Sequence, residues 1–231
     1  MTFLRLLVVS AGLAAFAAGP SGTPGGSRRL DTGSIQGRIV FTVADSPGPL
    51  DHRPALGDLG GQPREAVDRR RSVVYLKSAP LEAFDVAGPG RARMDQRNEQ
   101  FVPRVLAVTV GTTVDFPNND SKFHNVFSFS PARTFDLGLY PPGRTGSTRF
   151  DQAGIVQVFC DIHHHMRGYI LVFSHPFFAV TDDEGRFLIA GVPSGSYTLL
   201  VWSELGRAEP KRLTVTDGAS TDVEFQIGRE P

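Results

Sequence analysis

The sequence predicts an all-β protein built from sandwich-like or barrel-like layers. Short runs rich in Val, Ile, Phe and Tyr alternate with turn residues, and no stretch sustains the 3.6-residue periodicity of an amphipathic helix. Of the 231 residues, 40% are apolar and 21% are charged, which allows packed cores and argues against a disordered chain. The 24 Lys and Arg balance 24 Asp and Glu, so nothing in the net charge favours a nucleic-acid partner.

Two series of short strands follow from this pattern. The first comprises residues 35–43, 72–77, 105–110, 113–116, 125–129, 155–160 and 169–173. The second comprises residues 178–181, 186–190, 197–203, 212–216 and 221–227. Turn signals such as Gly111-Thr112 and Asp217-Gly218 separate them. Many short strands at this spacing are typical of sandwiches and barrels.

The N-terminal stretch has the order of a secretory signal peptide. Arg5 supplies a positive charge, an apolar run follows over residues 6–18, and small residues end it. The run is short for a membrane span, and nothing like it recurs in the sequence. We therefore expect a signal peptide over residues 1–18, a periplasmic or extracellular protein, and no integral membrane segment after cleavage. Residues 19–33, rich in Gly, Pro and Ser, are expected to form a flexible linker.

The single cysteine lies in a segment that carries metal-binding side chains. One Cys excludes an internal disulfide framework and a Cys-rich zinc module. The segment contains Cys160, His163, His164, His165 and Met166. Soft sulfur ligands favour copper, and two His, one Cys and a weak axial Met form the ligand set of blue-copper electron-transfer sites. A second His must then come from elsewhere, and His124, directly before the predicted strand of residues 125–129, is the leading candidate.

The spacing around these residues resembles that of a known family. Cys-x-x-His-x-x-Met followed by Arg-Gly and an apolar strand resembles the copper loop of amicyanin, a small cupredoxin. Upstream, residues 110–116 and His124-Asn125-Val126 resemble the cupredoxin strand, turn and first-histidine segment. The resemblance covers residues 90–174, and it implies a Greek-key β-sandwich that holds one type 1 copper per chain.

The resemblance also implies a role for each matching residue. It makes His124, Cys160 and His163 the trigonal ligands and Met166 the axial ligand. Asn125 is expected to brace the two ligand segments through hydrogen bonds, which orient the ligands and tune the metal.

The other histidines leave one alternative open. His165 offers the Cys-x₄-His spacing of some other cupredoxins, but Tyr169 rather than Met then follows four residues later, so His163 is preferred. His164 and His165 are otherwise expected to face solvent, as an electron-exit surface or a copper-capture site. His52 and His175 have no supporting context, and we expect them to be structural or exposed.

A second domain resembles another family. Residues 178–204 contain a Thr-Asp-x-x-Gly-x-Phe hairpin and a Pro-x-Gly-x-Tyr turn, which resemble the carboxypeptidase regulatory-like, transthyretin-type sandwich. The inward side chains of its strands are expected to be Phe187, Ile189, Tyr197, Leu199 and Val201. Residues 175–231 are few for an independent sandwich, and residues 34–40 and 73–76 resemble the opening strands of that family. We therefore expect a discontinuous sandwich from residues 34–89 and 175–231, with the copper domain of residues 90–174 inserted into it.

The whole arrangement resembles exported methylamine-utilisation-like proteins, a resemblance that assigns no substrate. We expect a non-enzymatic protein that transfers single electrons between redox partner proteins. One alternative is a periplasmic copper carrier or store. Another is a structural or carbohydrate-binding module that uses Trp202 and Tyr197, although alternation favours a core position for both. A copper oxidase or nitrite reductase would need further clusters of histidines, and six in all are too few.

Overall fold

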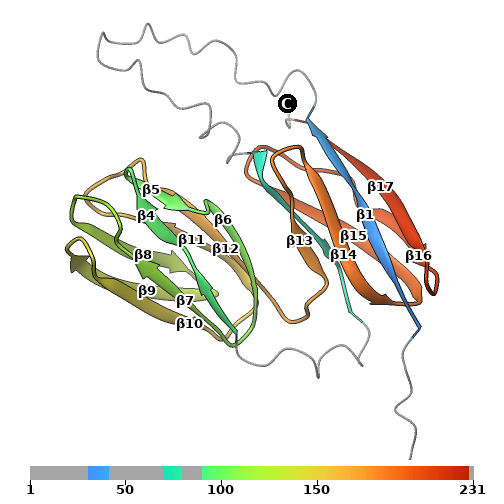
Figure 1. The fold of residues 1–231 in the computed structure, drawn as a ribbon, viewed down its shortest axis with the longest axis horizontal. Helices are drawn as coiled ribbons and strands as arrows, with labels where there is room; N and C mark the ends of the chain where they lie inside the picture. The colour runs from blue at the N-terminus through green and yellow to red at the C-terminus, as the bar shows by residue number, and fades with distance from the viewer. Residues whose placement is uncertain (1–30, 42–69, 80–89, 229–231) are drawn as a thin grey trace, which may run out of the picture. The chain divides into compact units, whose positions relative to one another are not determined.

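The computed structural model describes residues 31–41, 70–79 and 90–228, and in these ranges the regular elements are seventeen β-strands (Figure 1). The predicted all-β fold class is confirmed. The predicted signal peptide, most of the predicted linker and His52 lie outside the described residues. Among the residues that are described, no helix has the length and apolar character needed to cross a membrane.

The middle of the chain forms one sandwich with a single core. Its larger sheet contains, in spatial order, β6 (Val105–Thr109), β12 (Arg167–Phe173), β11 (Gly154–Phe159), β8 (His124–Ser130) and β9 (Arg133–Tyr140). The opposing sheet contains β10 (Thr145–Phe150), β7 (Thr112–Pro117) and β3 (Arg91–Arg93). A hairpin of β4 (Asp95–Arg97) and β5 (Gln100–Val102) completes it. Alternate residues of the facing strands, such as Val156 and Phe116, fill the space between the sheets.

The remaining strands form a second sandwich. One sheet contains, in spatial order, β14 (Arg186–Pro193), β1 (Thr32–Phe41) and β17 (Ser220–Ile227). The other contains β13 (Phe178–Val180), β2 (Ser72–Leu76), β15 (Gly195–Ser203) and β16 (Lys211–Val215). Because β1 pairs with β14 and β17, and β2 pairs with β13 and β15, strands from before and after the first sandwich share both sheets.

Two glycines allow the close approaches that this second sandwich requires. At Gly37, where β1 runs parallel to β17, an added Cβ would lie 1.7 Å from the carbonyl oxygen of Val223. Gly185, in the turn before β14, has a φ of 79°, and an added Cβ there would lie 2.6 Å from the carbonyl oxygen of Ile39. Side chains are excluded at both positions, so the turn signal at 185 reflects a steric requirement.

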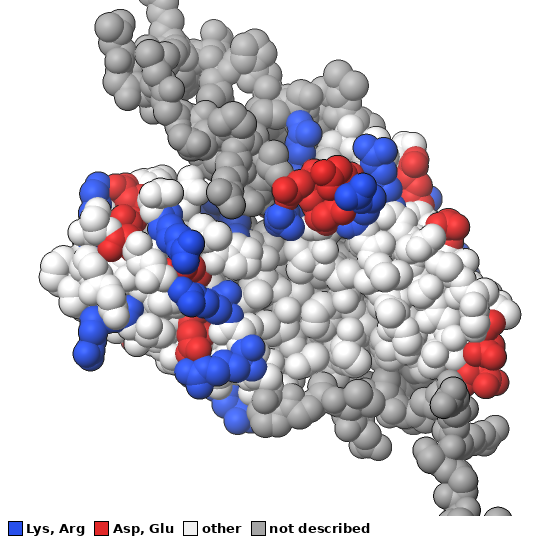
Figure 2. All heavy atoms as spheres, in the orientation of Figure 1, with Lys and Arg blue, Asp and Glu red and all other residues white. Residues whose placement is uncertain are grey.

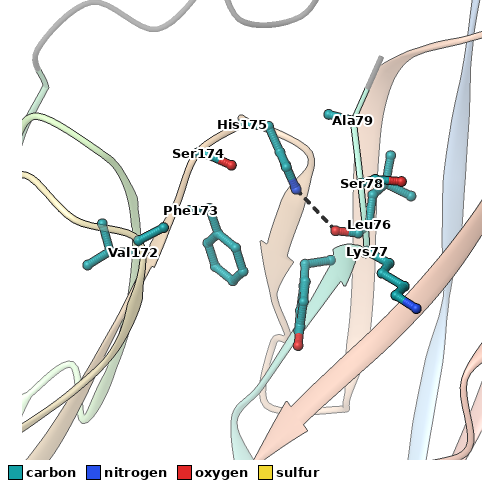
Figure 3. A pocket seen from close by; sticks show the side chains of 10 residues that line it. Leu76, Lys77, Ser78, Ala79, Val172, Phe173, Ser174 and His175 are labelled. Atoms are coloured by element: carbon teal, nitrogen blue, oxygen red, sulfur yellow. Dashed lines mark hydrogen bonds between the residues drawn. The ribbon is translucent and has the colours of Figure 1, made fainter. Parts of the chain in front are cut away.

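A third apolar cluster joins the outer face of the five-stranded sheet to the sheet that contains β2. Tyr169 of β12 lies against Trp202 of β15, with ring centroids 4.9 Å apart. At its edge the Arg104 guanidinium pairs with the Glu204 carboxylate at 2.7 Å, and both side chains are largely buried. His175, between β12 and β13, places its Nε2 3.1 Å from the carbonyl oxygen of Leu76 at the end of β2 (Figure 3). On the face drawn in Figure 2, acidic and basic side chains of the described residues are interspersed.

Candidate metal centre

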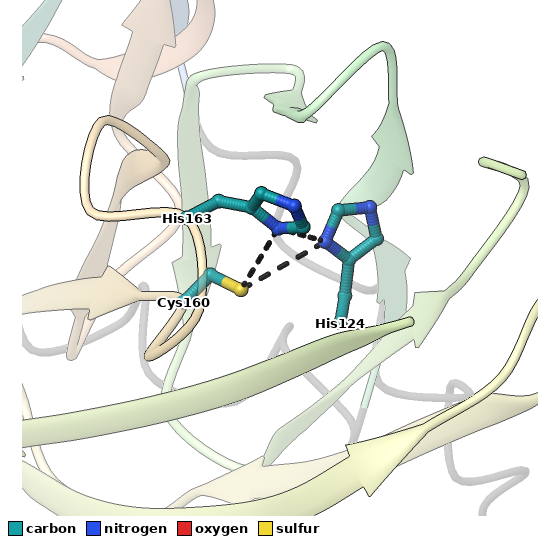
Figure 4. Close-up of side chains that lie close together, drawn as sticks. All are labelled: His124, Cys160 and His163. Atoms are coloured by element: carbon teal, nitrogen blue, oxygen red, sulfur yellow. Dashed lines mark hydrogen bonds between the residues drawn. The ribbon is translucent and has the colours of Figure 1, made fainter. Parts of the chain in front are cut away.

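Three potential metal ligands converge at one end of the first sandwich. His124 begins β8, Cys160 follows the last residue of β11, and His163 lies three residues further along the same loop. The cross-strand pair Phe159–Phe127 joins β11 to β8 and so brings the two ligand segments together. Figure 4 shows the three side chains turned toward a common point.

The distances among the ligand atoms suit a single metal ion. The Cys160 Sγ lies 3.8 Å from the Nδ1 of His124 and 3.7 Å from the Nδ1 of His163, and the two Nδ1 atoms are 3.0 Å apart. A metal bound at about 2.0–2.3 Å from imidazole nitrogen and thiolate sulfur separates such ligand atoms by about 3–4 Å. His124 is 0% and Cys160 2% exposed. A buried set of one thiol and two imidazoles therefore fits a soft-ligand metal such as copper.

Asp120 fixes the orientation of His124, a role that the sequence analysis missed. One carboxylate oxygen, Oδ2, lies 3.1 Å from the Nε2 of His124. Burial opposes ionisation of Asp120, but hydrogen bonds from the Glu99 N–H, His124 and the Ser121 N–H together hold its pKa below the ordinary value. An ionised carboxylate can only accept, so Nε2 carries the hydrogen and Nδ1 presents its lone pair toward Cys160. The feature of the sequence that could have indicated this role is an acidic residue four positions before the candidate ligand His124.

Asn125 links the two ligand segments, as the resemblance implies. Its Oδ1 accepts a hydrogen bond from the Asp161 backbone N–H at 3.1 Å, and its Nδ2 donates to the Asp136 Oδ1 at 2.7 Å. Asp161 directly follows Cys160, so the amide of Asn125 ties the cysteine loop to β8 on one side and β9 on the other.

The loop geometry separates the three consecutive histidines. The Met166 N–H donates to the His163 carbonyl oxygen at 2.9 Å, which closes a turn with His164 and His165 at its centre. Both central residues are exposed, and the Nε2 of His165 lies 3.3 Å from a carboxylate oxygen of Glu99. His163, not His165, therefore faces the Cys160 sulfur.

Met166 lies on the buried side of the same loop. It is 1% exposed and belongs to the same core cluster as Cys160. Its role as a fourth, axial ligand stays a prediction. His175 is a different case, because it lies beyond β12 and forms hydrogen bonds with the backbone of Leu76 and Phe177 in the second sandwich.

Burial also adjusts the protonation of His163. Desolvation is the main cause that lowers the pKa of His163, and the nearby His124 adds to it, while the carboxylate of Glu99 acts in the opposite direction. The neutral imidazole, which is the form that binds metal, therefore persists to lower pH than in a solvated histidine.

Comparison with known proteins gives partial structural likenesses. No family model matches the chain, and no curated protein matches it. A purple cupredoxin from Nitrosopumilus maritimus is 24% identical over 35% of this chain and 98% of its own, with a TM-score of 0.33. A mutant of amicyanin in its reduced state is 24% identical over 43% of this chain and 97% of its own, with a TM-score of 0.34. A copper-containing nitrite reductase from Thermus scotoductus SA-01 is 26% identical over 38% of this chain and 23% of its own, with a TM-score of 0.35. The converging ligand atoms, rather than these partial likenesses, carry the case for a metal centre.

Proposed function

We propose that this chain is an exported type 1 copper protein that transfers single electrons between redox partner proteins. The observation that carries the proposal is the buried triangle of Cys160 Sγ, His124 Nδ1 and His163 Nδ1, with sides of 3.0–3.8 Å. In this proposal Met166 is the axial ligand and each chain holds one copper. When bound, copper supplies a one-electron Cu(II)/Cu(I) couple.

The protein side of the site suits electron transfer. Asp120 sets the tautomer of His124, and Asn125 ties the segment that carries Cys160 to β8. These contacts hold the ligand atoms in place before metal arrives, so little rearrangement accompanies a change of oxidation state. With Met166 as the fourth ligand, protein side chains would fill the coordination positions of a bound copper, which would favour electron transfer over chemistry on a bound substrate.

The route for electrons is proposed to pass through His163. Among the three ligands it is the one with intermediate exposure, while His124 and Cys160 are buried. It also lies at the base of the exposed turn of His164 and His165, where a partner protein can approach. Export rests on the signal-like residues 1–18 of the sequence.

Spectroscopy of the copper-loaded protein tests the assignment. Cu(II) added to the purified chain is expected to give an intense visible thiolate-to-copper absorption, and Cys160→Ser is expected to abolish it. Stopped-flow mixing with a reduced c-type cytochrome should then bleach the band of the wild-type protein by one electron per chain.

Two outcomes contradict the proposal. A copper-loaded protein without the absorption excludes a type 1 site. A protein that shows the band but releases copper rapidly to a chelator, and exchanges no electrons, is a copper carrier rather than an electron-transfer protein.

A further inference from the structure

Among the residues that the structure describes, the second sandwich covers only part of the outer face of the five-stranded sheet. Its β6 and β12 side chains, including Tyr169 and Leu171, pack against the second sandwich in the third cluster. Next to them, β11 and β8 present an aromatic and aliphatic surface formed by Phe127, Phe129, Ile155 and Phe159. Phe129 is 78% and Ile155 49% exposed. Ile155 pairs across the strands with Leu171, so apolar surface continues at this point from the packed interface onto the exposed one, beside the polar Gln157.

One cross-strand row on this face has a charge at each end. Pairing places Arg167 of β12 opposite Phe159 of β11, Phe159 opposite Phe127 of β8, and Phe127 opposite Asp136 of β9. Directly opposed residues of antiparallel strands lie on the same face. The row therefore reads cation, two aromatic rings, anion.

Both charges are available to a partner. The Arg167 guanidinium lies over the Phe159 ring, 5.5 Å from its centroid, and it forms no ion pair among the described residues. Asp136 is exposed, and its hydrogen bonds from the Asn125 amide and the Gly138 N–H both go to Oδ1. Within the described part of the chain, its Oδ2 therefore has no hydrogen-bond partner.

We propose that a second copy of this chain binds this face in a symmetric dimer. The second sandwich covers β12, which leaves β11, β8 and β9 open. A two-fold axis along β8 places Phe127 and Phe129 against their own counterparts, and sets β11 of each copy opposite β9 of the other. The guanidinium of Arg167, which already reaches over Phe159 of β11, then meets the Asp136 carboxylate of the other copy.

The dimensions and the symmetry agree with this arrangement. Facing sheets pack about 10 Å apart, a distance that Phe side chains fill and that Arg and Asp together can span. The row is self-complementary, because the rotation exchanges its positive and negative ends. A surface three strands wide is small for an obligate interface, so we expect a reversible dimer whose population depends on protein concentration.

Sedimentation velocity of the full chain over a concentration series tests the proposal, in the absence of metal. Wild type is expected to show a monomer–dimer equilibrium. Arg167→Glu and Asp136→Lys each place like charges opposite one another twice, and each should raise the dimer dissociation constant at least about tenfold. The double variant restores the pairs in reversed order, and its dissociation constant should return to within about threefold of wild type.

Two further variants keep the test decisive if Asp136→Lys disturbs the neighbouring Asn125. Phe129→Asp, which removes no polar contact, should abolish the dimer. Leu188→Asp is the matched control, because Leu188 is an equally apolar residue, 57% exposed, on β14 of the other sandwich, and it should leave the dimer unchanged.

A wild-type chain that stays monomeric at every concentration overturns the proposal. A dimer that survives Phe129→Asp, or that fails to recover in a correctly folded double variant, overturns it as well.

Discussion

The two sandwiches share an architecture but use their buried polar groups differently. The core of the second sandwich consists of hydrocarbon side chains such as Leu199 and Phe225. Two of its buried polar residues pair with one another: the Ser72 N–H donates to the Thr181 Oγ1 at 3.0 Å, and the Thr181 N–H donates to the Ser72 carbonyl oxygen at 2.9 Å. Each N–H of this pair donates to an oxygen of the other residue, so these groups are not available to a ligand.

One end of the first sandwich instead brings together sulfur and nitrogen atoms whose lone pairs can bind a metal. Its core cluster contains Cys160 and Met166 among the hydrocarbon residues, and His124 is buried beside them. The sulfur and the two Nδ1 atoms face one another at distances of 3.0–3.8 Å. The two sandwiches therefore differ in their buried polar groups. In the second sandwich these groups form hydrogen bonds with each other or with the backbone, whereas in the first a sulfur and two nitrogen atoms are placed where a metal could bind them.

The largest expected effect separates the two candidate ligand histidines. His163→Gly should lower copper affinity by more than about 100-fold and remove the thiolate-to-copper band, because it deletes a ligand atom from the triangle. His165→Gly, in the exposed turn of the same loop, should leave both unchanged. The measurements are competitive copper titration and visible absorption. The opposite result, with the band lost in His165→Gly and kept in His163→Gly, would assign the Cys-x₄-His spacing instead.

A core variant of the second sandwich should change stability alone. Leu199→Ala removes a fully buried side chain and should lower the free energy of unfolding by about 2–5 kcal/mol. The absorption spectrum of the copper-loaded protein should not shift, because Leu199 belongs to the other core. Urea unfolding followed by circular dichroism gives the first quantity. A shifted copper band would mean that the two sandwiches are coupled more tightly than their separate cores indicate.

A smaller effect is expected at Asp120. Asp120→Ala removes the acceptor that fixes the tautomer of His124, and copper affinity should fall by about 10–100-fold. Asp120→Asn keeps an acceptor oxygen and should retain most of that affinity. Asp151→Ala, which removes an exposed carboxylate paired with Arg149, is the control. Equal affinities in all three variants would exclude the positioning role.

The smallest effect concerns pH and His175. Burial lowers the pKa of His175 below its ordinary value of 6.5, with an opposing contribution from the hydrogen bond to the Leu76 carbonyl. Below pH 6.5 the unfolded chain therefore binds more protons than the folded chain, and stability falls as pH falls from 6.5 toward the lower folded pKa. His175→Gln should make this decline shallower in copper-free protein, as measured by unfolding between about pH 5 and pH 8. Identical pH profiles would show that the pKa of His175 is the same in the folded and unfolded chains.

The sequence predicted the fold class from local strand patterns, and it indicated the candidate ligands from the spacing of a motif. Strand patterns depend on local alternation, which is visible in residues such as Phe187 and Leu199. Cys160 and His163 are close in sequence, and the motif alone indicated His124. The sequence did not predict the role of Asp120, because this role depends on how the loop between β7 and β8 places the Asp120 carboxylate against His124. The backbone N–H of Glu99, from an earlier part of the chain, also donates to this carboxylate. The charged row from Arg167 to Asp136 was equally invisible, since it depends on the register of four strands.

The parallel pairing of β1 with β17 has a mechanical consequence. The ladder runs from Ser34 beside Ser220 to Phe41 beside Ile227, so the start of β1 and the end of β17 leave the pair at opposite ends. Tension applied at these two points loads the ladder in shear, and all its hydrogen bonds resist together rather than opening one by one. The first sandwich, which carries the ligand triangle, joins the chain between β2 and β13 and lies outside this load path. A pull on the ends of the pair is therefore borne by β1 and β17, and the ligand triangle keeps its spacing until they part.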